Sequence, residues 1–402
     1  MKTNIKRLKH FGFLAASFLA LGLLMVPNAL AAIAISEYPV PGTPQPGYIA
    51  AGPDGNMWFT GTSGNVIAKI TPSGTVAQYP VPTSNADPSG IAKGPDGNMW
   101  FSELQANQIG KITPSGTITE YAVPTSNSSP YGITGGPDGN VWFGEAGANQ
   151  IGKITPSGTI TEYPVPTSGG SPRGIVTGPG GNLWFSEYFG NKIGEVTPSG
   201  TFTEYSLPTA NSRPNGITVG SDGNIWFTET GTNKIGKMDP SGNVLGEYPV
   251  PTNNSGLDTI ASGPDGNLWF AEYGSGSGSN VGQITPAGII TEYPTPTSNS
   301  APLGIAAGPD NNMWFTEYAA NNIGVITGLT IPPNNNSGSG GTGNASASGG
   351  ISTPDTGYGT PAGSATAMRS IATTSFVMIG AGLWLLYRSR RNAHYTIKRY
   401  IA

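Results

Sequence analysis

The sequence contains no cysteine and only two histidines, His10 and His394, both outside the repeated part of the chain described below. The absence of cysteine excludes disulfides and thiolate-bound metals. The repeated part also lacks imidazole groups, which excludes serine–histidine and cysteine–histidine catalysis and histidine-bound zinc there. Any general base in that part has to be a carboxylate or a perturbed lysine.

Charged residues are scarce as well, at 10% of the chain, and they are unevenly distributed. Residues 32–330 hold 22 acidic and 9 basic residues, while the remaining basic residues gather at the two ends. An acidic domain without a basic aromatic stripe repels phosphate backbones. We therefore expect no binding to nucleic acids.

One ten-residue sequence motif recurs along the chain. Residues 94–103 read Gly-Pro-Asp-Gly-Asn-Met-Trp-Phe-Ser-Glu, and close copies of this motif recur at intervals of 42 to 45 residues. The seven tryptophans that mark the copies are Trp58, Trp100, Trp142, Trp184, Trp226, Trp269 and Trp314. Gly-Pro-Asp-Gly is typical of a tight turn, and the adjacent Trp and Phe of the following strand point to opposite faces. Such a strand must be covered on both sides.

Each repeat contains four short segments rich in Ile, Val, Thr, Tyr and Trp, and no stretch has helical periodicity. Four strands with short connections fill such a repeat. The fold class expected is all-β, a seven-bladed β-propeller with four-stranded antiparallel blades. The seventh repeat stops at residues 322–327 without its fourth strand, and residues 35–40 supply that sequence ahead of the first repeat. The N-terminal strand is therefore predicted to complete the last blade and close the ring.

The two ends of the chain predict an exported and anchored protein. Residues 1–31 have the basic start, the apolar stretch and the Ala-Leu-Ala end of a signal peptide, with an uncleaved N-terminal anchor as the alternative. Residues 331–370 form a Gly-, Ser-, Asn- and Pro-rich linker that is predicted to be disordered. Residues 371–387 are mainly apolar and precede a basic tail, 388–402, which predicts one transmembrane helix with the propeller outside and the tail in the cytoplasm.

Residues 353–357 read Thr-Pro-Asp-Thr-Gly and resemble the sorting signal that sortases cut. That signal has Leu at the first position and lies closer to its apolar span. The resemblance implies covalent attachment to the cell wall through Thr356, as an alternative to simple anchoring in the membrane.

Antiparallel order places two positions of every repeat at one end of the ring, which we call the mouth. The first is residue x in the Pro-x-Gly-Ile start of each first strand, and it varies: Gly47, Ser89, Tyr131, Arg173, Asn215, Asp258 and Leu303. The second is the glutamate that ends the Trp-Phe strand: Glu103, Glu145, Glu187, Glu229, Glu272 and Glu317, with Gly61 in the first repeat. One varied position on a repeated scaffold favours a recognition surface, with unconstrained drift as the alternative. The candidate binding residues are Tyr131, Arg173, Asn215, Asp258 and Glu229.

The repeated glutamates have two interpretations. A catalytic group is needed once, so six copies favour a structural role, the capping of loop amides in every blade. Several carboxylates around one mouth also suit a hard cation such as Mg²⁺ or Ca²⁺, with Glu272 and Glu317 as candidate ligands. The sixth repeat is unusual, because residues 255–260 lack the usual Pro and Gly and the loop at 274–279 is longer. If the chain has a single site, Asp258 and Glu272 of this repeat are therefore its candidate residues.

Residues 35–327 resemble the virginiamycin B lyase (streptogramin lyase) family. The resemblance rests on the repeated motif Gly-Pro-Asp-Gly-Asn-x-Trp-Phe-Thr-Glu, followed by Asn-Lys-Ile-Gly-Lys-Ile-Thr-Pro-Ser-Gly. The resemblance implies a seven-bladed propeller and a Mg²⁺-dependent elimination that linearises a cyclic depsipeptide at its ester bond. It also implies histidines at position x and glutamates at the same mouth. This sequence keeps Glu272 and Glu317 but has Asp258 and Leu303 where the histidines of the last two blades are expected.

Two functions follow as expectations. The first is an extracellular binding or interaction module that takes a small molecule, a glycan or a protein at the mouth. The second is a lyase-like opening of a cyclic depsipeptide or lactone by Asp258, Glu272, Glu317 and a divalent metal. The lack of histidine favours the first.

Overall fold

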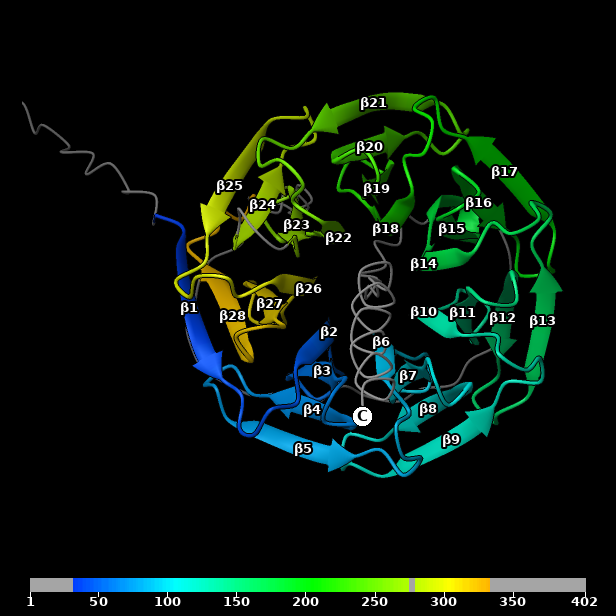
Figure 1. The fold of residues 1–402 in the computed structure, drawn as a ribbon, viewed down its shortest axis with the longest axis horizontal. Coiled ribbons are helices and arrows are strands. Elements are labelled where there is room, and N and C mark those ends of the chain that lie inside the picture. Colours follow the sequence, from blue (N-terminus) through cyan, green and yellow to red (C-terminus); the bar gives the residue numbers. More distant parts are fainter. Residues whose placement is uncertain (1–31, 275–278, 333–402) are drawn as a thin grey trace, which may run out of the picture.

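The computed structural model describes residues 32–274 and 279–332, which form seven four-stranded sheets around a central axis (Figure 1). Each sheet is antiparallel, and its strands follow one another from the axis outwards. The predicted all-β, seven-bladed propeller with four-stranded blades is confirmed.

The strands of the blades have the following bounds. Blade 1 contains β2 (Pro46–Ala51), β3 (Met57–Gly61), β4 (Val66–Ile70) and β5 (Val76–Pro80), and blade 2 contains β6 (Pro88–Lys93), β7 (Met99–Glu103), β8 (Gln108–Ile112) and β9 (Ile118–Ala122). Blade 3 contains β10 (Pro130–Gly135), β11 (Val141–Glu145), β12 (Gln150–Ile154) and β13 (Ile160–Pro164), and blade 4 contains β14 (Pro172–Thr177), β15 (Leu183–Glu187), β16 (Lys192–Val196) and β17 (Phe202–Ser206). Blade 5 contains β18 (Pro214–Val219), β19 (Ile225–Glu229), β20 (Lys234–Met238) and β21 (Val244–Pro249), and blade 6 contains β22 (Leu257–Ser262), β23 (Leu268–Glu272), β24 (Asn280–Ile284) and β25 (Ile290–Pro294). Blade 7 contains β26 (Pro302–Ala307), β27 (Met313–Glu317), β28 (Asn322–Thr327) and β1 (Ala34–Pro39).

The last blade takes its outer strand from the start of the domain, as the sequence predicts. β1 pairs with β28 in antiparallel register from Ala34 opposite Thr327 to Pro39 opposite Asn322. The side chain of Asn321 extends the contact, because its Nδ2 donates to the carbonyl of Val40 at 2.8 Å. The ring is therefore closed by a pairing between the two ends of the domain.

A buried stack of aromatic and charged groups explains why the sequence motif recurs in the repeats. Trp58 is fully buried and stacks on Tyr79 of the outer strand, with ring centroids 5.7 Å apart. Its Nε1 donates to Asp54 in the preceding turn at 2.9 Å. Lys69 lies over the indole and donates to the carbonyl of Pro114 in the next blade, also at 2.9 Å. The stack thus stabilises one blade and joins it to its neighbour.

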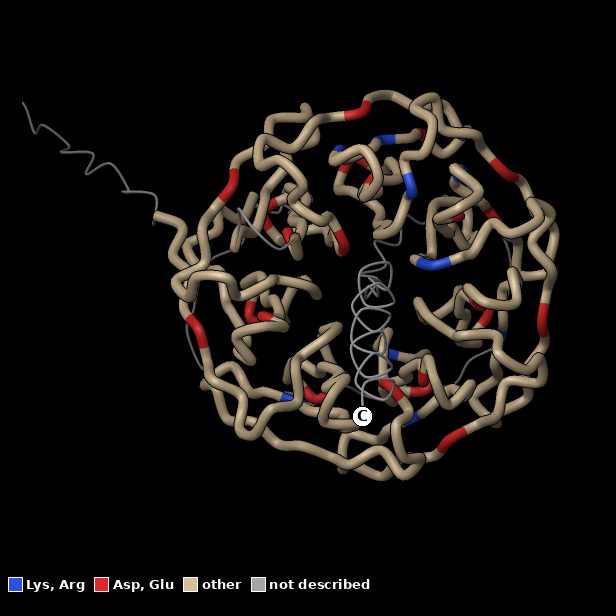
Figure 2. The backbone as a smooth tube through the Cα atoms, in the orientation of Figure 1, with Lys and Arg blue, Asp and Glu red and all other residues tan. Residues whose placement is uncertain are grey.

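Acidic residues mark the outer strands (Figure 2). Six of these strands carry one glutamate each: Glu37, Glu120, Glu162, Glu204, Glu247 and Glu292. The outer strand of blade 1, β5, has Gln78 at the corresponding position. These six glutamates therefore form a rim of carboxylates around the ring.

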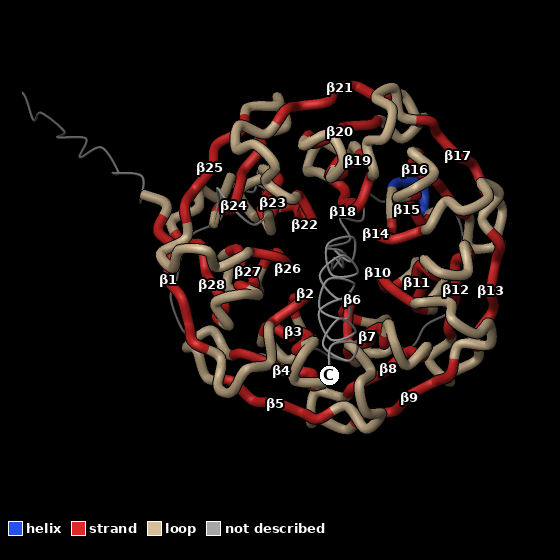
Figure 3. The backbone as a smooth tube through the Cα atoms, in the orientation of Figure 1, coloured by secondary structure: helices blue, strands red, loops and turns tan. Residues whose placement is uncertain are grey.

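Blade 4 departs from the common turn. Its Pro179–Gly181 segment forms η1, a short 3-10 helix (Figure 3), with Gly180 where the other blades have the turn aspartate. The Nε1 of Trp184 consequently has no hydrogen-bond partner among the described residues. Glu195 stands at the position of the usual lysine and accepts from Asn182 at 2.6 Å and from the hydroxyl of Tyr205 at 3.0 Å.

The predicted terminal segments lie outside the described residues: the signal peptide, most of the linker, the transmembrane helix at 371–387 and the basic tail. In the part that the structure describes, no helix has the length and apolar character needed to cross a membrane. These expectations therefore stay predictions.

Candidate functional site

A β-bulge at the start of every first strand places residue x at the mouth. In blade 3, Pro130 lies opposite Glu145, but Ile133 lies opposite Phe143, so the first strand carries one residue more than its partner. The same shift occurs in the other six blades. A bulge of this kind re-aims side chains. The pairing also confirms that residue x and the second-strand glutamate lie at the same end of the ring.

Hydroxyl groups of the second strands fix the backbone of residue x. In blade 5, Thr228 Oγ1 accepts from the amide of Gly216 at 2.8 Å and donates to the carbonyl of Asp258 in blade 6 at 2.9 Å. Ser186 makes the same pair of bonds, to Gly174 at 3.0 Å and to the carbonyl of Asn215 at 2.6 Å. Each such hydroxyl therefore joins two blades at the inner ring.

Blade 6 is joined to the next blade by a different hydroxyl, which explains the unusual sequence of its first strand. Ala271 stands where the other blades have this hydroxyl, or glycine in blade 3. Thr259, which replaces the usual glycine of the first strand, donates from Oγ1 to the carbonyl of Leu303 in blade 7 at 2.5 Å. The missing hydroxyl of one strand is thus supplied by the other.

Four predicted binding residues fall into two groups at the mouth. Asn215 donates from Nδ2 to Asp258 Oδ1 at 3.1 Å, and both side chains are buried. Arg173 lies 5.5 Å from the ring centroid of Tyr131, measured from Cζ. Burial raises the pKa of Tyr131 well above its ordinary value, although the positive charge of Arg173 opposes this. The structure therefore joins Asn215 to Asp258 and Tyr131 to Arg173.

Three tyrosines at the mouth were missed by sequence reasoning. Tyr188, Tyr273 and Tyr318 each follow directly after the repeated glutamate of the second strand. The Arg173 Cζ lies 3.4 Å from the ring centroid of Tyr188, and Tyr273 packs edge to face against Tyr318 with centroids 5.7 Å apart. Burial raises the pKa of Tyr273, and nearby Tyr318 and Asp258 add to this. The position after the glutamate varies between repeats, and that variation was the available signal.

The second-strand glutamates are buried inside the blades. Glu145 is fully buried and shares the side of the sheet on which Phe143 lies over Gly152. A Cβ on Gly152 would be 2.2 Å from Phe143 and 2.7 Å from Glu145 Oε1, so only glycine fits there. Burial, together with the neighbouring carboxyl of Glu162, raises the pKa of Glu145 to about 8. Near neutral pH this raised pKa favours the protonated, neutral form of Glu145.

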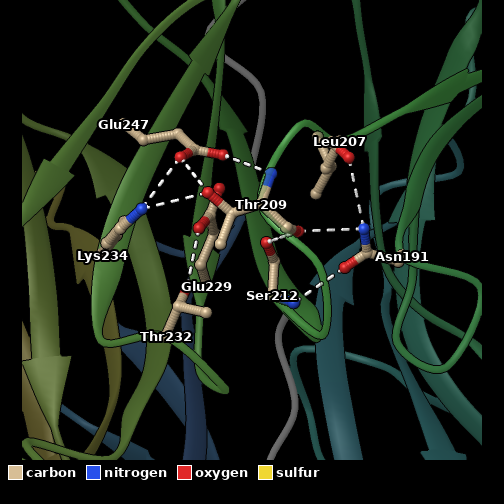
Figure 4. Close-up of polar contacts among 8 residues, drawn as sticks. All are labelled: Asn191, Leu207, Thr209, Ser212, Glu229, Thr232, Lys234 and Glu247. Atoms are coloured by element: carbon tan, nitrogen blue, oxygen red, sulfur yellow. Dashed lines mark hydrogen bonds and ion pairs between the residues drawn. The ribbon is translucent and has the colours of Figure 1, made fainter.

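Figure 4 shows the corresponding group in blade 5, where Glu229 lies near Glu247 of the outer strand. Glu229 accepts from Thr232 Oγ1 at 2.8 Å, and Glu247 accepts from Lys234 at 2.9 Å and from the hydroxyl of Thr209 in blade 4. Burial raises the pKa of Glu229 to about 7, with the bond from Thr232 opposing and Glu247 adding to the shift. Glu229 thus lies beside Glu247, and it is Glu247 that makes the bond to blade 4.

Loop amides are capped by the outer-strand glutamates, which corrects the structural role expected for the second-strand ones. Glu120 accepts from the amide of Thr83 at 2.9 Å and from its hydroxyl at 3.0 Å. The same bonds recur between the loop threonine of one blade and the outer glutamate of the next. In the last instance Glu37 binds Thr297 at 2.8 Å and 2.6 Å, across the closure of the ring.

Blade 1 provides an internal comparison. It has Gly61 in place of the second-strand glutamate and Gln78 in place of the outer one, so both acidic groups are replaced by neutral residues. Gln78 Nε2 still contacts the preceding loop, by donating to the carbonyl of Pro41 at 2.8 Å. The two glutamates are therefore kept or lost together within this chain.

The candidate metal ligands are members of these carboxyl pairs. Burial raises the pKa of Glu272 to about 8, and Glu292 adds to the shift; the pKa of Glu317 is raised to about 7, again mainly by burial. Glu272 accepts from Asn280 at 3.3 Å. The raised pKa of these two carboxyls disfavours the ionised form that a Mg²⁺ ligand needs, and across residues 32–274 and 279–332 no group of three or more acidic residues is placed to hold one cation. Glu272 and Glu317 do not fit such a site as they stand, and cation binding stays a prediction.

The known proteins most informative for this site are streptogramin lyases. A solved streptogramin B lyase is 38% identical over 73% of this chain and 97% of that chain, with a TM-score of 0.69. Virginiamycin B lyase from Staphylococcus aureus is 38% identical over 74% of this chain and 99% of that chain, with a TM-score of 0.70. The same values hold for its catalytically inactive histidine-to-alanine variant solved with quinupristin.

Shorter and weaker similarities agree with these. The virginiamycin B lyases of Bordetella parapertussis and Bordetella bronchiseptica are 37% identical over 59 residues, and this match spans 14% of the present chain and 19% of theirs. Hydrazine synthase of Kuenenia stuttgartiensis, at 17% identity and a TM-score of 0.59, shares the fold alone. A model of the virginiamycin B lyase family matches residues 29–224 and 174–330. The chain therefore belongs to the virginiamycin B lyase family.

Proposed function

We propose that this chain is an exported, surface-tethered propeller that binds a ligand at its mouth and does not carry out the elimination known from the family. The observation that carries this proposal is the mouth itself, where differing side chains from neighbouring blades meet: Asn215 with Asp258, and Tyr131 and Tyr188 with Arg173. Varied polar and aromatic groups on a repeated, rigid scaffold are typical of recognition surfaces.

The chemistry of the mouth supports binding over catalysis. Elimination across an ester requires a base that removes the proton next to a carbonyl. The repeated part has no histidine, and the two positions where the resemblance implies one hold Asp258 and Leu303. Leucine transfers no proton, and the Asp258 carboxylate already accepts a hydrogen bond from Asn215 at 3.1 Å.

Quinupristin provides the first test, because it accompanies the inactive variant of the related enzyme. The full-length chain in mild detergent is incubated with quinupristin, with and without Mg²⁺, and the ligand is examined by mass spectrometry. We expect the ligand to remain cyclic, with the Staphylococcus aureus enzyme as the positive control. A linear product would overturn the proposal that the chain is not a lyase.

Binding is measured separately by calorimetry and by the melting temperature of the protein, with quinupristin, glycans and peptides as ligands. A ligand specific to the folded state at about 100 times its Kd stabilises that state by about 2.7 kcal/mol. Asp258→Ala should reduce this stabilisation, whereas Lys153→Gln on the outer part of blade 3 should not. If no ligand in the panel binds, the binding function fails.

The lyase remains the second candidate, because the sequence is 38% identical to solved lyases over nearly their whole length. In that case Asp258 would act as the base, and Asp258→Asn would abolish formation of the linear product. Localisation outside the cell rests on the predicted signal and membrane span. Digestion of intact cells with an added protease tests it, since a cytoplasmic propeller would stay uncut.

A further inference from the structure

We propose that Arg173, Arg213, Tyr131, Tyr188 and Phe189, which we call the arginine–tyrosine cluster, bind the carboxylate of an organic ligand that carries an apolar or aromatic group. This inference rests on the proposed function, because it assigns a ligand class to one part of the mouth. The cluster combines three neighbouring blades: Tyr131 from blade 3, Arg173 and the 188–189 segment from blade 4, and Arg213 from the start of blade 5.

The first step concerns the orientation of Arg173. Its Cζ lies 3.4 Å from the centroid of the Tyr188 ring, the separation of a guanidinium stacked flat on an aromatic face. Stacking occupies the faces of the guanidinium and leaves its N–H edge available. That edge is the part of arginine that binds a carboxylate through two parallel hydrogen bonds.

The second step concerns charge compensation. Arg173 is only 6% exposed, and its Nε has no hydrogen-bond partner in the described part of the chain. The ion pairs between described residues all use lysine, so the Arg173 guanidinium has no carboxylate partner there. A buried charge that makes no direct ion pair is costly, and a bound anion would offset that cost.

A second arginine lies near the same ring. The Cζ of Arg213 is 5.9 Å from the Tyr188 centroid, and Arg173 and Arg213 are the two arginines of residues 32–330. Arg213 is exposed and has a left-handed backbone with φ 50°, which a non-glycine residue adopts at a cost. The preceding loop is fixed by Asn191, whose Oδ1 accepts from the amide of Ser212 at 2.7 Å. The loop thus holds a second positive charge beside the first.

The apolar part of the ligand is suggested by Phe189. Its side chain is 64% exposed and packs edge to face on Tyr188 with centroids 4.9 Å apart. An exposed aromatic next to two arginines suits a ligand with a ring or aliphatic group close to its charge. The surrounding excess of acidic residues disfavours a dianion, so a single carboxylate fits better than a phosphate. The terminal residue of a peptide and a small aromatic acid share this chemistry.

The test uses N-acetyl-phenylalanine and its neutral amide as matched probes, with the full-length chain and isothermal calorimetry. Loss of the carboxylate should weaken binding at least about tenfold, the usual effect of removing a charge-assisted hydrogen bond. Inorganic phosphate should bind more weakly than the acid. A tripeptide ending in phenylalanine, compared with the single residue, distinguishes a peptide terminus from a free acid.

Arg173→Gln should reduce affinity for the acid at least about tenfold, and Arg173→Lys should restore little, because lysine has no planar fork. Arg213→Gln changes an exposed side chain and supplies a second test if Arg173→Gln lowers the melting temperature. Lys153→Gln is the matched control and should leave affinity unchanged. Equal binding of acid and amide, or unchanged affinity in both arginine variants, would overturn the inference. If quinupristin binds and the acid does not, this subsite fails while the binding function stands; if nothing binds, both fail.

Discussion

Single residues show how a buried carboxyl is made tolerable in each blade. Glu145 cannot reach water, and it lies beside Glu162, so burial and this neighbouring carboxyl raise the pKa of Glu145 and favour its neutral form. Glu162 in turn accepts from the amide and hydroxyl of Thr125, at 2.9 Å each. The two glutamates therefore differ in role, one as a neutral acid and the other as the acceptor that holds a loop.

This difference predicts unequal effects of two matching substitutions. Glu145→Gln keeps the shape and neutrality of the acid, so the free energy of unfolding at pH 7 should change by less than about 1 kcal/mol. Glu162→Gln leaves one of the two Thr125 donors without its acceptor and should cost about 1–3 kcal/mol. Urea denaturation of the two variants measures both values. Equal losses would contradict the assignment of the proton to the inner residue.

The sequence was sufficient to predict which face of its strand carries Glu145, but not that Glu162 lies beside it. Residues two apart on a strand share a face, so Glu145 had to lie on the side of Phe143 and hence inside the blade. Placing Glu162 beside it required the register of two further strand pairings across Gly152. Tyr188 was less predictable, because the residue after the repeated glutamate is not aromatic in every repeat: Leu104, Ala146 and Thr230 stand there in three others.

At the scale of elements, the strand β1 determines whether the ring has a free edge. β28 pairs with β27 on one side and β1 on the other, so removal of β1 would expose a row of unpaired backbone groups. It would also remove the bonds from Thr297 to Glu37.

A chain that begins at residue 41 should therefore aggregate, or melt at least about 10 °C below one that begins at residue 32, since 1 kcal/mol corresponds to about 2–4 °C in domains of about 150–250 residues. Differential scanning calorimetry and light scattering compare the two. Equal melting temperatures would show that β1 contributes little to closure.

The blades and their closure could be predicted because repetition makes each missing or extra segment visible. The displaced fourth strand at residues 35–40 is the clearest case. The bulge at Tyr131 could not be predicted, because a propensity for strand does not reveal which residue is unpaired. The role of Thr259 was also inaccessible, since it depends on the absence of a hydroxyl at Ala271 on another strand.

At the scale of the whole molecule, the carboxyl pairs make stability depend on pH. The pKa is raised to about 8 for Glu103, Glu145, Glu187 and Glu272 and to about 7 for Glu229 and Glu317, from an ordinary 4.5. The folded state binds protons that the unfolded chain releases, so this contribution is complete below about pH 4.5 and is lost as the pH rises to about 8. Groups such as Asp54 act in the opposite sense: burial opposes their ionisation, but hydrogen bonds from Trp58 and Asn56 lower the pKa.

The propeller should accordingly be most stable near about pH 5, and its melting temperature should fall between pH 5 and pH 8. As the pH falls below about 3.8 towards the lower folded-state pKa of Asp54, the stabilisation from its ionised form is lost, and stability declines again on the acid side. Calorimetry over this range measures the effect. A melting temperature that rises from pH 5 to pH 8 would contradict the proposed protonation of the six glutamates, and Glu145→Gln should flatten the curve slightly.

The closure of the ring has a consequence for the order of events during synthesis. Ala34 accepts a hydrogen bond from Thr327, although 293 residues separate them. The ribosome releases residues 34–39 first and their partners 322–327 after all the other blades, so every incomplete chain carries an unmatched leading segment. Blades 1 to 6 can assemble as they emerge, whereas the pairing of β1 with β28 forms only once the whole domain has been translated.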